Sequence, residues 1–401
     1  MPRLLDRALG FERELIEIRR DLHRHPELAF QEVRTAGIAA DRVAALGFEV
    51  RRGVGRTGVV AELRNGDGPV VALRADMDAL PIQEANEVDY ASTVPGVMHA
   101  CGHDAHVAGL IGAARLLAEA RDRGELPPGT VRLLFQPSEE TSDEENRTGA
   151  ERMIEDGAMA GVDAVFGLHV WASLPAGRVY LRPGPLMAGS DMVYAAVEGR
   201  ASHAARPHEG VDAVVLAAHA VLACQNIVAR RISPLDAGVV TIGTIQGGVA
   251  PNVVAERVEL RGTIRYFEEH VRTVLHREVR AAFDSVRALG GHATVEIVPA
   301  CRPVRNDPAM TELARAAVAD ALGEDVIEVA ELTMGAEDFS AYLEHAPGAF
   351  IWLGAAPNPP REHHHPLFDI DERVLACGTT ILAACAIRAL AELRSRARQN
   401  P

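Results

Sequence analysis

The sequence predicts an α/β fold in which a mixed sheet covered by helices is interrupted by a smaller, inserted α+β domain of the ferredoxin-like type. Three observations lead to this prediction. The 401 residues exceed what one hydrophobic core usually supports, and a hydrophobic content of 48% is enough to fill two cores. Helical and strand patterns alternate through the first half of the chain, as in sheets covered by helices. The middle of the chain follows the order β-α-β-β-α-β of a ferredoxin-like unit.

The first half of the chain supplies elements of the larger domain. Apolar residues recur at helical spacing in four segments, and the second of these ends at Gly47, a typical helix stop. Apolar runs of strand length lie among them. The expected helices cover residues 11–25, 32–47, 106–124 and 148–159, and the expected strands cover residues 58–63, 69–74, 130–135 and 163–171.

The middle of the chain is predicted to be the inserted domain, at residues 187–299. The larger domain is therefore discontinuous, with residues 1–186 followed by residues 300–401. The strands expected in the inserted domain cover residues 191–199, 238–246, 253–267 and 292–300, and its helices cover residues 210–231 and 268–290. Helices at 307–323 and 374–397 and an apolar strand at 348–354 complete the larger domain.

Composition excludes several classes of partner. Lys+Arg 41 against Asp+Glu 56 give a formal charge of -15, which repels nucleic acid phosphates and anionic membrane surfaces. The N-terminal segment lacks the apolar core of a secretion signal, and we expect no run approaching the ~20 apolar residues that span a bilayer. The 5 scattered cysteines do not indicate a disulfide framework. We therefore expect a soluble, cytoplasmic protein that binds neither nucleic acid nor membrane.

Polar side chains follow several predicted strands at the point where each strand ends. Sites in open α/β sheets form beyond the carboxyl ends of strands, so we expect these side chains to converge on one edge of the sheet. They are Asp76 and Asp78, Glu139 and Glu140, His169, and the run His363, His364 and His365.

The stretch from Pro95 to His106 places Cys101 and His103 in what we expect to be a glycine-containing loop. A thiolate with an imidazole suits zinc and other borderline divalent ions, and carboxylates also suit manganese. Two other interpretations stay open. Cys101 can be a buried free cysteine beside Asp104 as a helix cap, or a nucleophile with His103 as its base, which leaves the paired glutamates without a role.

Glu139 and Glu140 cannot both lie on one face of an extended backbone. One of them can coordinate a metal while the other faces the water that the metal activates. The alternative is a solvated acidic turn, which the acidic run at 142–146 supports, although the pair directly follows a strongly apolar strand. Likewise, His169 can be a core histidine bonded to a carbonyl, and the three C-terminal histidines can form an exposed loop tip.

Together, these residues and their surroundings resemble the M20 metallopeptidase family, in its amidohydrolase branch of hippurate hydrolases, N-acyl-amino-acid amidohydrolases and plant auxin-conjugate hydrolases. The similar segments span nearly the whole chain in family order. They are HRHPELAFQE, LRADMDALPIQE, MHACGHDAH, LLFQPSEE, GLHV, GRASHAARPHEGVDAV, APNVVAERVELRGTIR, MGAEDFS and HHPLFDIDE.

The resemblance implies a centre of two divalent metal ions per subunit, Zn²⁺ or Mn²⁺. Glu139 corresponds to the family's general base. His364 is chosen as a ligand because the branch's ligand stands two places before the proline, here Pro366, while His363 and His365 remain alternatives. The implied ligands are Cys101, His103, Glu140, His169 and His364.

The resemblance also implies that the inserted domain is a lid that forms a dimer interface. His203 corresponds to a histidine that stabilises the tetrahedral intermediate, in some relatives within the neighbouring subunit's site. Asn252 and Arg265 correspond to groups that hold the substrate carboxylate, and Glu337 is expected to line the site. Without the resemblance, Asn252 would be read as a turn residue and Arg265 as a solvated strand residue. The alternative role for Glu337 is a helix cap. The segment 141–153 departs from the glycine-rich sequence common after the paired glutamates, which affects the acyl group preferred.

The expected activity is hydrolysis of the amide bond of N-acyl amino acids such as hippurate, with metal-activated water and Glu139 as general base. The forked donors of Arg265 suit a planar carboxylate, so we expect a substrate with a free carboxylate. A metallo-carboxypeptidase or dipeptidase acting on short peptides is the alternative. A non-catalytic binding protein would have no need of Glu139 beside a full ligand set. We expect the chain to assemble as a homodimer or homotetramer.

Overall fold

A computed structural model describes residues 4–399 of the chain, which divide into two compact units. Unit 1 contains the residues up to Leu186, Arg305–Glu331 and the residues from Asp338 onward. Unit 2 contains Met187–Val304 and the short segment Leu332–Glu337. The predicted fold class is confirmed, because one unit holds a large mixed sheet with helices and the other is a separate sheet-rich insertion.

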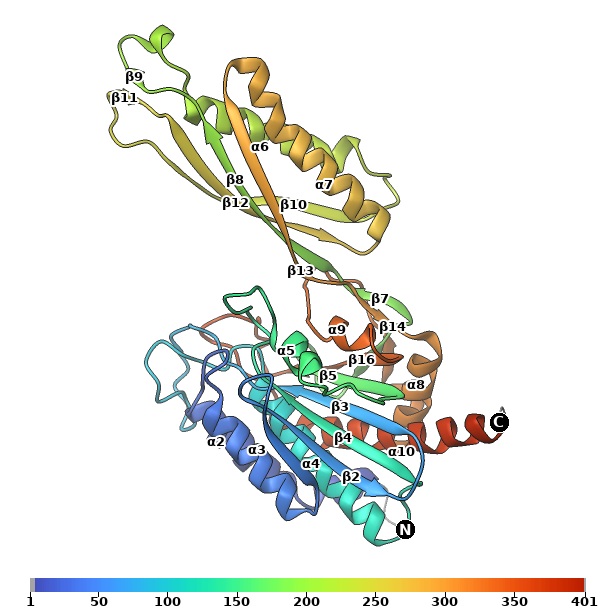
Figure 1. Cartoon of the computed structure of the whole chain (residues 1–401). Coiled ribbons are helices and arrows are strands. Elements are labelled where there is room, and N and C mark those ends of the chain that lie inside the picture. The colour runs from blue at the N-terminus through green and yellow to red at the C-terminus, as the bar shows by residue number, and fades with distance from the viewer. Residues whose placement is uncertain (1–3, 400–401) are drawn as a thin grey trace. The chain divides into compact units, whose positions relative to one another are not determined.

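Unit 1 is built on an eight-stranded mixed sheet (Figure 1). Its strands are β1 (Glu49–Val54), β2 (Gly58–Asn65), β3 (Val70–Asp76), β4 (Gly129–Gln136), β5 (Ala164–Pro175), β6 (Val179–Leu181), β15 (Ile327–Val329) and β16 (Gly348–Ala356). They lie in the order β1-β2-β4-β3-β5-β16-β6-β15. The central strands β4, β3, β5 and β16 are parallel, so their carboxyl ends meet at one edge of the sheet. These strands are apolar and buried because helices cover both faces.

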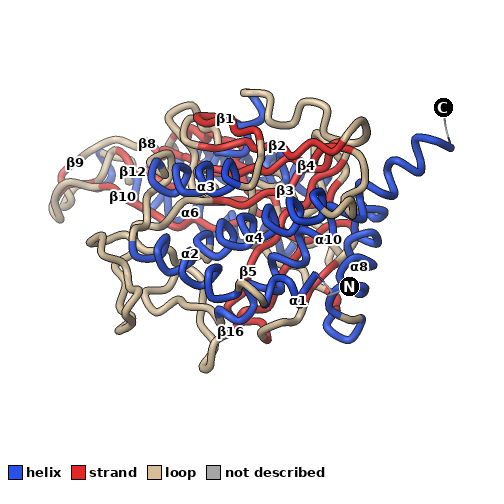
Figure 2. Tube along the Cα trace, turned by 90° about the horizontal axis from the view of Figure 1, so that it is seen from below, coloured by secondary structure: helices blue, strands red, loops and turns tan. Residues whose placement is uncertain are grey.

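The helices of unit 1 form a layer on each face of that sheet. They are α1 (Leu4–Leu9), α2 (Glu12–Arg24), α3 (Val33–Ala45), α4 (His103–Asp122), α5 (Gly149–Glu155), α8 (Pro308–Leu322), α9 (Ser340–Leu343) and α10 (Leu375–Gln399). Helices α2, α4 and α10 pack together on one face, and α5 and α9 lie on the other (Figures 1 and 2). Helix α4 begins at His103, earlier than expected, because Gly102 before it adopts φ +91 and turns the loop directly into the helix.

Unit 2 contains a four-stranded antiparallel sheet with two helices. Its elements are β8 (Gly189–Glu198), α6 (Ala213–Arg230), β10 (Gly238–Gly247), β12 (Arg257–Tyr266), α7 (Glu269–Asp284) and β13 (His292–Cys301). The strand order β10-β12-β8-β13 is that of a ferredoxin-like unit. The strand expected over 253–267 is interrupted, and its first part, β11 (Val253–Val254), pairs instead with β9 (Ser202–His203). Two further strands, β7 (Gly184–Met187) and β14 (Val304–Asn306), form a separate pair, and most of their residues belong to unit 1.

Two helices among the described residues are long and apolar enough to cross a membrane by length and composition, α6 and the segment Glu372–Arg396. This corrects the expectation that no run approaches that length. The C-terminal helix is mostly buried in the core of unit 1, as the central helix of a globular unit would be. Helix α6 buries a smaller share and leaves an apolar face exposed.

Candidate metal centre

The carboxyl ends of the central strands of unit 1 bring the predicted metal ligands together. Cys101 lies in the loop just before α4, His103 is the first residue of that helix, and Glu140 follows the end of β4. His169 lies within β5, which continues beyond it, and His364 lies in the loop after β16. The sheet topology therefore gathers residues from four separate parts of the chain.

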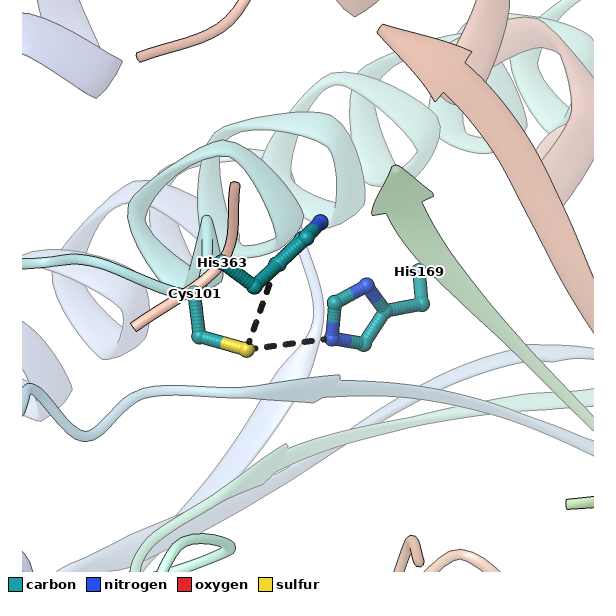
Figure 3. Close-up of side chains that lie close together, drawn as sticks. All are labelled: Cys101, His169 and His363. Carbon is teal, nitrogen blue, oxygen red and sulfur yellow. Dashed lines mark hydrogen bonds between the residues drawn. The ribbon is translucent and has the colours of Figure 1, made fainter. Parts of the chain in front are cut away.

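Cys101 and His169 face each other inside this cluster (Figure 3). The sulfur of Cys101 lies 3.4 Å from Nε2 of His169. Nδ1 of His169 lies 2.6 Å from the carbonyl oxygen of Val170, to which it donates. In a neutral imidazole this bond leaves the Nε2 lone pair directed at the sulfur, which is the arrangement that a histidine ligand needs.

His103 is oriented by a carboxylate on its other side. Its Nδ1 lies 3.1 Å from Oδ1 of Asp78, and the second oxygen of Asp78 accepts the backbone N–H of Glu140 at 3.0 Å. Metal-binding histidines commonly donate their other ring nitrogen to a carboxylate in this way. Nε2 of His103 is completely buried, has no hydrogen-bond partner, and lies 4.0 Å from Oε1 of Glu140.

The neighbouring histidines His363 and His364 point to different partners. Nδ1 of His363 lies 3.7 Å from the sulfur of Cys101, while its Nε2 accepts the backbone N–H of Ala172 at 3.1 Å. A neutral ring that accepts at Nε2 carries its proton on Nδ1, so His363 is arranged to donate to the sulfur. Nε2 of His364 lies 3.0 Å from Oε1 of Glu140. The structure thus brings His364 to the cluster through Glu140, and it brings His363 there as well.

The donor set fits divalent cations. Ligand atoms of Cys101, His103 and Glu140 lie within 4.8 Å of one another, and so do those of Cys101, His169 and His363. A buried imidazole nitrogen without a partner costs free energy unless something else occupies its lone pair. Thiolate, imidazole and carboxylate together are ligands for zinc and similar ions. The residues therefore form a suitable binding site for divalent cations.

The electrostatics of the cluster favour a cation. Burial raises the pKa of the Cys101 thiol well above its ordinary value, and the carboxylate of Glu140 raises it further. Burial opposes a charge on His103, but the carboxylates of Asp76 and Asp78 outweigh burial and raise its pKa to about 10. In both cases nearby carboxylates favour the protonated form, and a bound cation takes the place of such protons.

Sequence reasoning missed the supporting role of His106 and Asp76. Nδ1 of His106 lies 2.5 Å from Oδ1 of Asp76, and its Nε2 accepts the backbone N–H of Val170 at 2.9 Å. Both ring nitrogens of His106 are therefore occupied, so it supports the strand that carries His169 and does not compete for a cation. The signal for this role was the position of Asp76 at a strand end, beside the metal cluster.

Asp104 does not cap a helix, contrary to one of the alternatives considered from the sequence. It lies inside the first turn of α4, and Gly102 occupies the cap position. Its carboxylate accepts from the buried Arg19 at 2.8 Å and lies 2.8 Å from Nδ1 of His23. The segment containing the metal ligands is therefore anchored to α2 by a buried ion pair.

Glu139 and Glu140 diverge, as adjacent residues at a strand end should. Glu140 joins the cluster with Cys101 and His103, whereas carboxyl oxygens of Glu139 and Asp338 lie within 4.8 Å of each other. Glu139 belongs to neither of the two ligand clusters described above that contain Cys101. Glu337 is buried and stands directly before Asp338, in the segment assigned to unit 2.

The remaining predicted site residues lie in unit 2. His203 in β9 pairs with Val253, and the carbonyl of Asn252 accepts the backbone N–H of Ala204 at 3.0 Å, so His203 and Asn252 are close together. Arg265 lies near the end of β12 and pairs with Ser190 at the start of β8. The far end of β12, Arg257, pairs with the end of β8, from which β9 follows. His203 and Arg265 therefore lie toward opposite ends of the sheet, and Figure 1 shows β9 and β11 beyond one end of β8 and β12.

Comparison with known proteins identifies relatives along almost the full chain. The model of peptidase family M20/M25/M40 matches residues 72–388. An N-acetyl-L-cysteine deacetylase of Bacillus subtilis is 41% identical over 381 residues, which cover 94% of this chain and 89% of that protein. A thermostable carboxypeptidase of Saccharolobus solfataricus is 39% identical over 381 residues, which cover 93% and 95%.

A solved structure agrees with these matches. It is the crystal structure of a Bacillus subtilis protein described as a dinuclear metal-binding peptidase from the M20 family. It superposes with a TM-score of 0.82 at 36% sequence identity and covers 95% of this chain and 99% of that chain. The fold thus agrees between the two proteins, and this chain contains candidate ligand clusters for metal ions.

Proposed function

Because this chain belongs to peptidase family M20/M25/M40 and is a metal-dependent amidohydrolase, we propose that it cleaves the amide bond of N-acyl amino acids. The observation that carries the proposal is the divergence of the paired glutamates. Glu140 lies among the candidate ligands, and Glu139 lies outside them. A carboxylate beside a metal centre, but not bound to it, is suited to proton transfer.

The five predicted ligands, Cys101, His103, Glu140, His169 and His364, would hold two divalent ions, Zn²⁺ or Mn²⁺. Such ions supply Lewis-acid polarisation of the carbonyl and lower the pKa of water. Asp78 holds His103 in the tautomer that leaves Nε2 free. His363 is placed to donate a hydrogen bond to the Cys101 sulfur, which stabilises its thiolate form.

Glu139 would move one proton in each turnover. It takes the proton from the attacking water as the oxygen bonds to the carbonyl carbon, and it returns that proton to the leaving nitrogen as the C–N bond breaks. The products are a carboxylic acid and a free amino acid, and no covalent intermediate with the protein forms. His203 would donate to the oxyanion of the tetrahedral intermediate.

The substrate carboxylate would be held by Arg265 and Asn252. From Arg257 to Arg265, β12 extends about 27 Å at roughly 3.4 Å per residue, and His203 follows the end of β8 that pairs with Arg257. A small N-acyl amino acid cannot touch both Arg265 and His203 within a single copy of unit 2. We therefore propose that His203 and Asn252 act in the site of a second subunit, while Arg265 acts in its own.

The exposed face of α6 supports such a second copy. Val214, Val215, Leu222 and Val228 on this helix are exposed, and Leu222 is 66% exposed. The neighbouring strand β10 is an edge of its sheet. An apolar face beside an open strand edge favours pairing with an identical surface through a two-fold axis.

The dimer has a direct test. Leu222→Arg should shift the protein to monomers in sedimentation velocity and abolish hydrolysis, because each site would lose His203 of the partner. Val33→Arg in unit 1, where the side chain is 71% exposed, is the matched control and should leave both properties unchanged. A Leu222→Arg protein that stays dimeric would contradict this interface.

The function is tested by measuring metal content together with release of glycine from benzoyl-glycine. The wild-type protein should bind two ions per subunit and release the amino acid. Glu139→Gln should keep both ions and lose activity by at least about 10³-fold, in line with the loss of an essential base. Substantial hydrolysis by a metal-loaded Glu139→Gln preparation would reject the base assignment.

Cleavage of short peptides is the second candidate, and a specific observation favours it, namely the similarity to a thermostable carboxypeptidase. A substrate panel of N-acetyl and N-benzoyl amino acids against dipeptides separates the two activities. We expect the N-acyl amino acids to give the higher kcat/KM. Faster turnover of dipeptides would assign the site to a peptidase.

A further inference from the structure

Glu32 is a buried carboxylate that takes no part in the mechanism above. It lies just before α3 and is completely buried. Its Oε1 accepts the backbone N–H groups of Phe30 at 2.8 Å and of Ser138 at 2.9 Å, and its Oε2 accepts the hydroxyl of Thr57 at 2.5 Å. Burying a carboxylate costs free energy unless hydrogen bonds satisfy its oxygens, as these three do. Its contact with Ser138 reaches a residue 106 positions away.

Ser138 has an unusual backbone at a decisive position. Its φ is +45, in the left-handed region that residues other than glycine rarely adopt. Glu139 and Glu140 follow it directly, so the conformation of Ser138 sets the direction in which both glutamates leave β4. If Ser138 relaxed to a right-handed or extended conformation, both side chains would turn away from their present positions.

The start of α5 also holds the turn at Ser138, through the carbonyl group of that residue. The carbonyl of Ser138 accepts the backbone N–H of Gly149 at 2.9 Å, at the start of α5. A Cβ atom on Gly149 would lie 1.6 Å from the carbonyl oxygen of Pro137, so only glycine allows this contact. The carbonyl side of the turn is thus fixed by α5, and its N–H side is fixed by Glu32.

We propose that Glu32 is a positioning residue that holds the N–H of Ser138 and so fixes the left-handed turn from which Glu139 and Glu140 reach the metal centre. This inference rests on the proposed function, because it takes Glu139 as the base and Glu140 as a ligand. Glu32 itself contacts neither substrate nor metal in this account. It acts through one backbone hydrogen bond.

The bond to Ser138 does not depend on the charge of Glu32. Burial raises the pKa of Glu32 to about 7, against the opposing hydrogen bond from Thr57. When protonated, the carboxyl group can donate to the Thr57 hydroxyl and still accept the Ser138 N–H at Oε1. A glutamine can do the same, with its amide N–H₂ toward Thr57 and its oxygen toward Ser138.

The test compares Glu32→Ala with Glu32→Gln. Removing the acceptor in Glu32→Ala should lower kcat by about 10- to 100-fold at saturating metal, with a smaller change in KM, since misplaced catalytic groups cost this much. Affinity for added Zn²⁺, measured by calorimetry, should fall about 10-fold because Glu140 moves with the turn. Glu32→Gln should restore most of both properties. If Glu32→Ala retains wild-type kcat and zinc affinity, the inference is wrong.

Glu27 provides a matched control in the same segment. Its carboxylate also accepts two backbone N–H groups, those of Arg34 at 2.9 Å and Thr35 at 2.8 Å, but these belong to α3. Glu27→Ala should lower the melting temperature without lowering kcat or zinc affinity. Equal losses of kcat in Glu27→Ala and Glu32→Ala would show that Glu32 serves only general stability.

One further variant keeps the outcome decisive. If Glu32→Ala does not fold, Glu32→Asp replaces it, because its carboxylate is one methylene too short to keep the bond to Ser138. A Glu32→Asp protein with unchanged kcat and zinc affinity would overturn the inference. Failure of the proposed function is recognised separately, by hydrolysis that survives in Glu139→Gln.

Discussion

At the scale of single residues, the hydrogen bonds of each histidine decide its role. His169 and His103 each give one ring nitrogen to an oxygen and keep the other for the centre. Both nitrogens of His106 are occupied by protein groups. Sequence proximity alone cannot separate these cases, since all three histidines follow or precede apolar segments. The partner of the second nitrogen is what distinguishes a candidate ligand from a supporting residue.

The adjacent histidines allow a direct test of ligand assignment. His364→Ala should lower the zinc content from two ions per subunit toward one, because it removes a ligand beside Glu140. His363→Ala should keep both ions, because the ring nitrogen that faces Cys101 is arranged as a donor. Atomic emission measurements on dialysed protein give the number of zinc ions per subunit. The opposite pattern would make His363 the ligand.

Asp78 should control metal affinity although it is not predicted to be a ligand. Asp78→Asn weakens the acceptor for His103 and for the backbone N–H of Glu140, so zinc affinity should fall by roughly 10- to 100-fold. Competition with a chelating dye measures this change. Asp67→Asn, at an exposed position in the same unit, is the control and should bind zinc normally. Equal affinities in the two variants would contradict the orienting role.

Glu32 should make stability depend on pH. Its pKa is raised from 4.5 to about 7 in the folded protein, mainly by burial, with Asp78 as a nearby negative charge. A raised carboxyl pKa gives stability that is present below pH 4.5 and is lost as pH rises to 7. Relative to Glu32→Gln, the wild type should therefore lose roughly 3 kcal/mol of unfolding free energy between these limits. Urea denaturation at pH 5 and pH 8 measures the unfolding free energies of both proteins. If the wild type and Glu32→Gln differ by the same amount at both pH values, the prediction is wrong.

At the scale of elements, the approach of α4 to its neighbours positions the predicted metal ligand His103, which opens this helix. Gly112 in α4 faces α10 and α2 so closely that a Cβ there would lie 2.5 Å from Oγ1 of Thr379 and 2.8 Å from a methyl carbon of Leu15. The glycine lets the three helices pack together. Sequence patterns predicted these helices but not which glycine lies at their contact.

Gly112→Ala should therefore destabilise the protein by roughly 1–3 kcal/mol, because the added methyl group separates α4 from α10. Gly109→Ala is a control in the same helix, where a Cβ would meet only the backbone nitrogen of Thr379 at 4.0 Å. It should be neutral or slightly stabilising, because alanine favours helix more than glycine. Thermal unfolding of the two variants measures the difference, and similar melting temperatures would show that the contact is adaptable.

At the scale of the whole molecule, the residues of unit 2 that are proposed to act on the substrate do not lie at a single point. The two ends of the unit 2 sheet carry different groups, His203 with Asn252 at one end and Arg265 at the other. The composite site of two copies proposed above would account for this separation. It would also give the apolar face of α6 a partner.

Mixing inactive subunits tests the composite site. Glu139→Gln and His203→Ala should each be inactive alone. After the two are unfolded and refolded together, half of the dimers are mixed, and each mixed dimer has one intact site, so activity should return to about a quarter of the wild-type value. No recovery, with mixed dimers present by mass spectrometry, would place His203 in the site of its own subunit.

The sequence by itself determined the fold class and the family, and it located the metal-centre candidates. Apolar periodicity reports local conformation, and polar residues at the ends of parallel strands must meet at one edge, so both could be inferred before any coordinates. The resemblance of nine segments along the chain to one family supplied the family and the expected roles of the site residues.

The tertiary structure alone decided which atoms face each other. The tautomers of the histidines, the left-handed turn at Ser138 and the bond from Glu32 to that turn all depend on contacts between residues far apart in the chain. The same holds for the interruption that separates β11 from β12, since β11 pairs with β9 instead of extending the main sheet. Periodicity carries no information about such contacts, because a hydrogen bond depends on distance and direction within about an ångström.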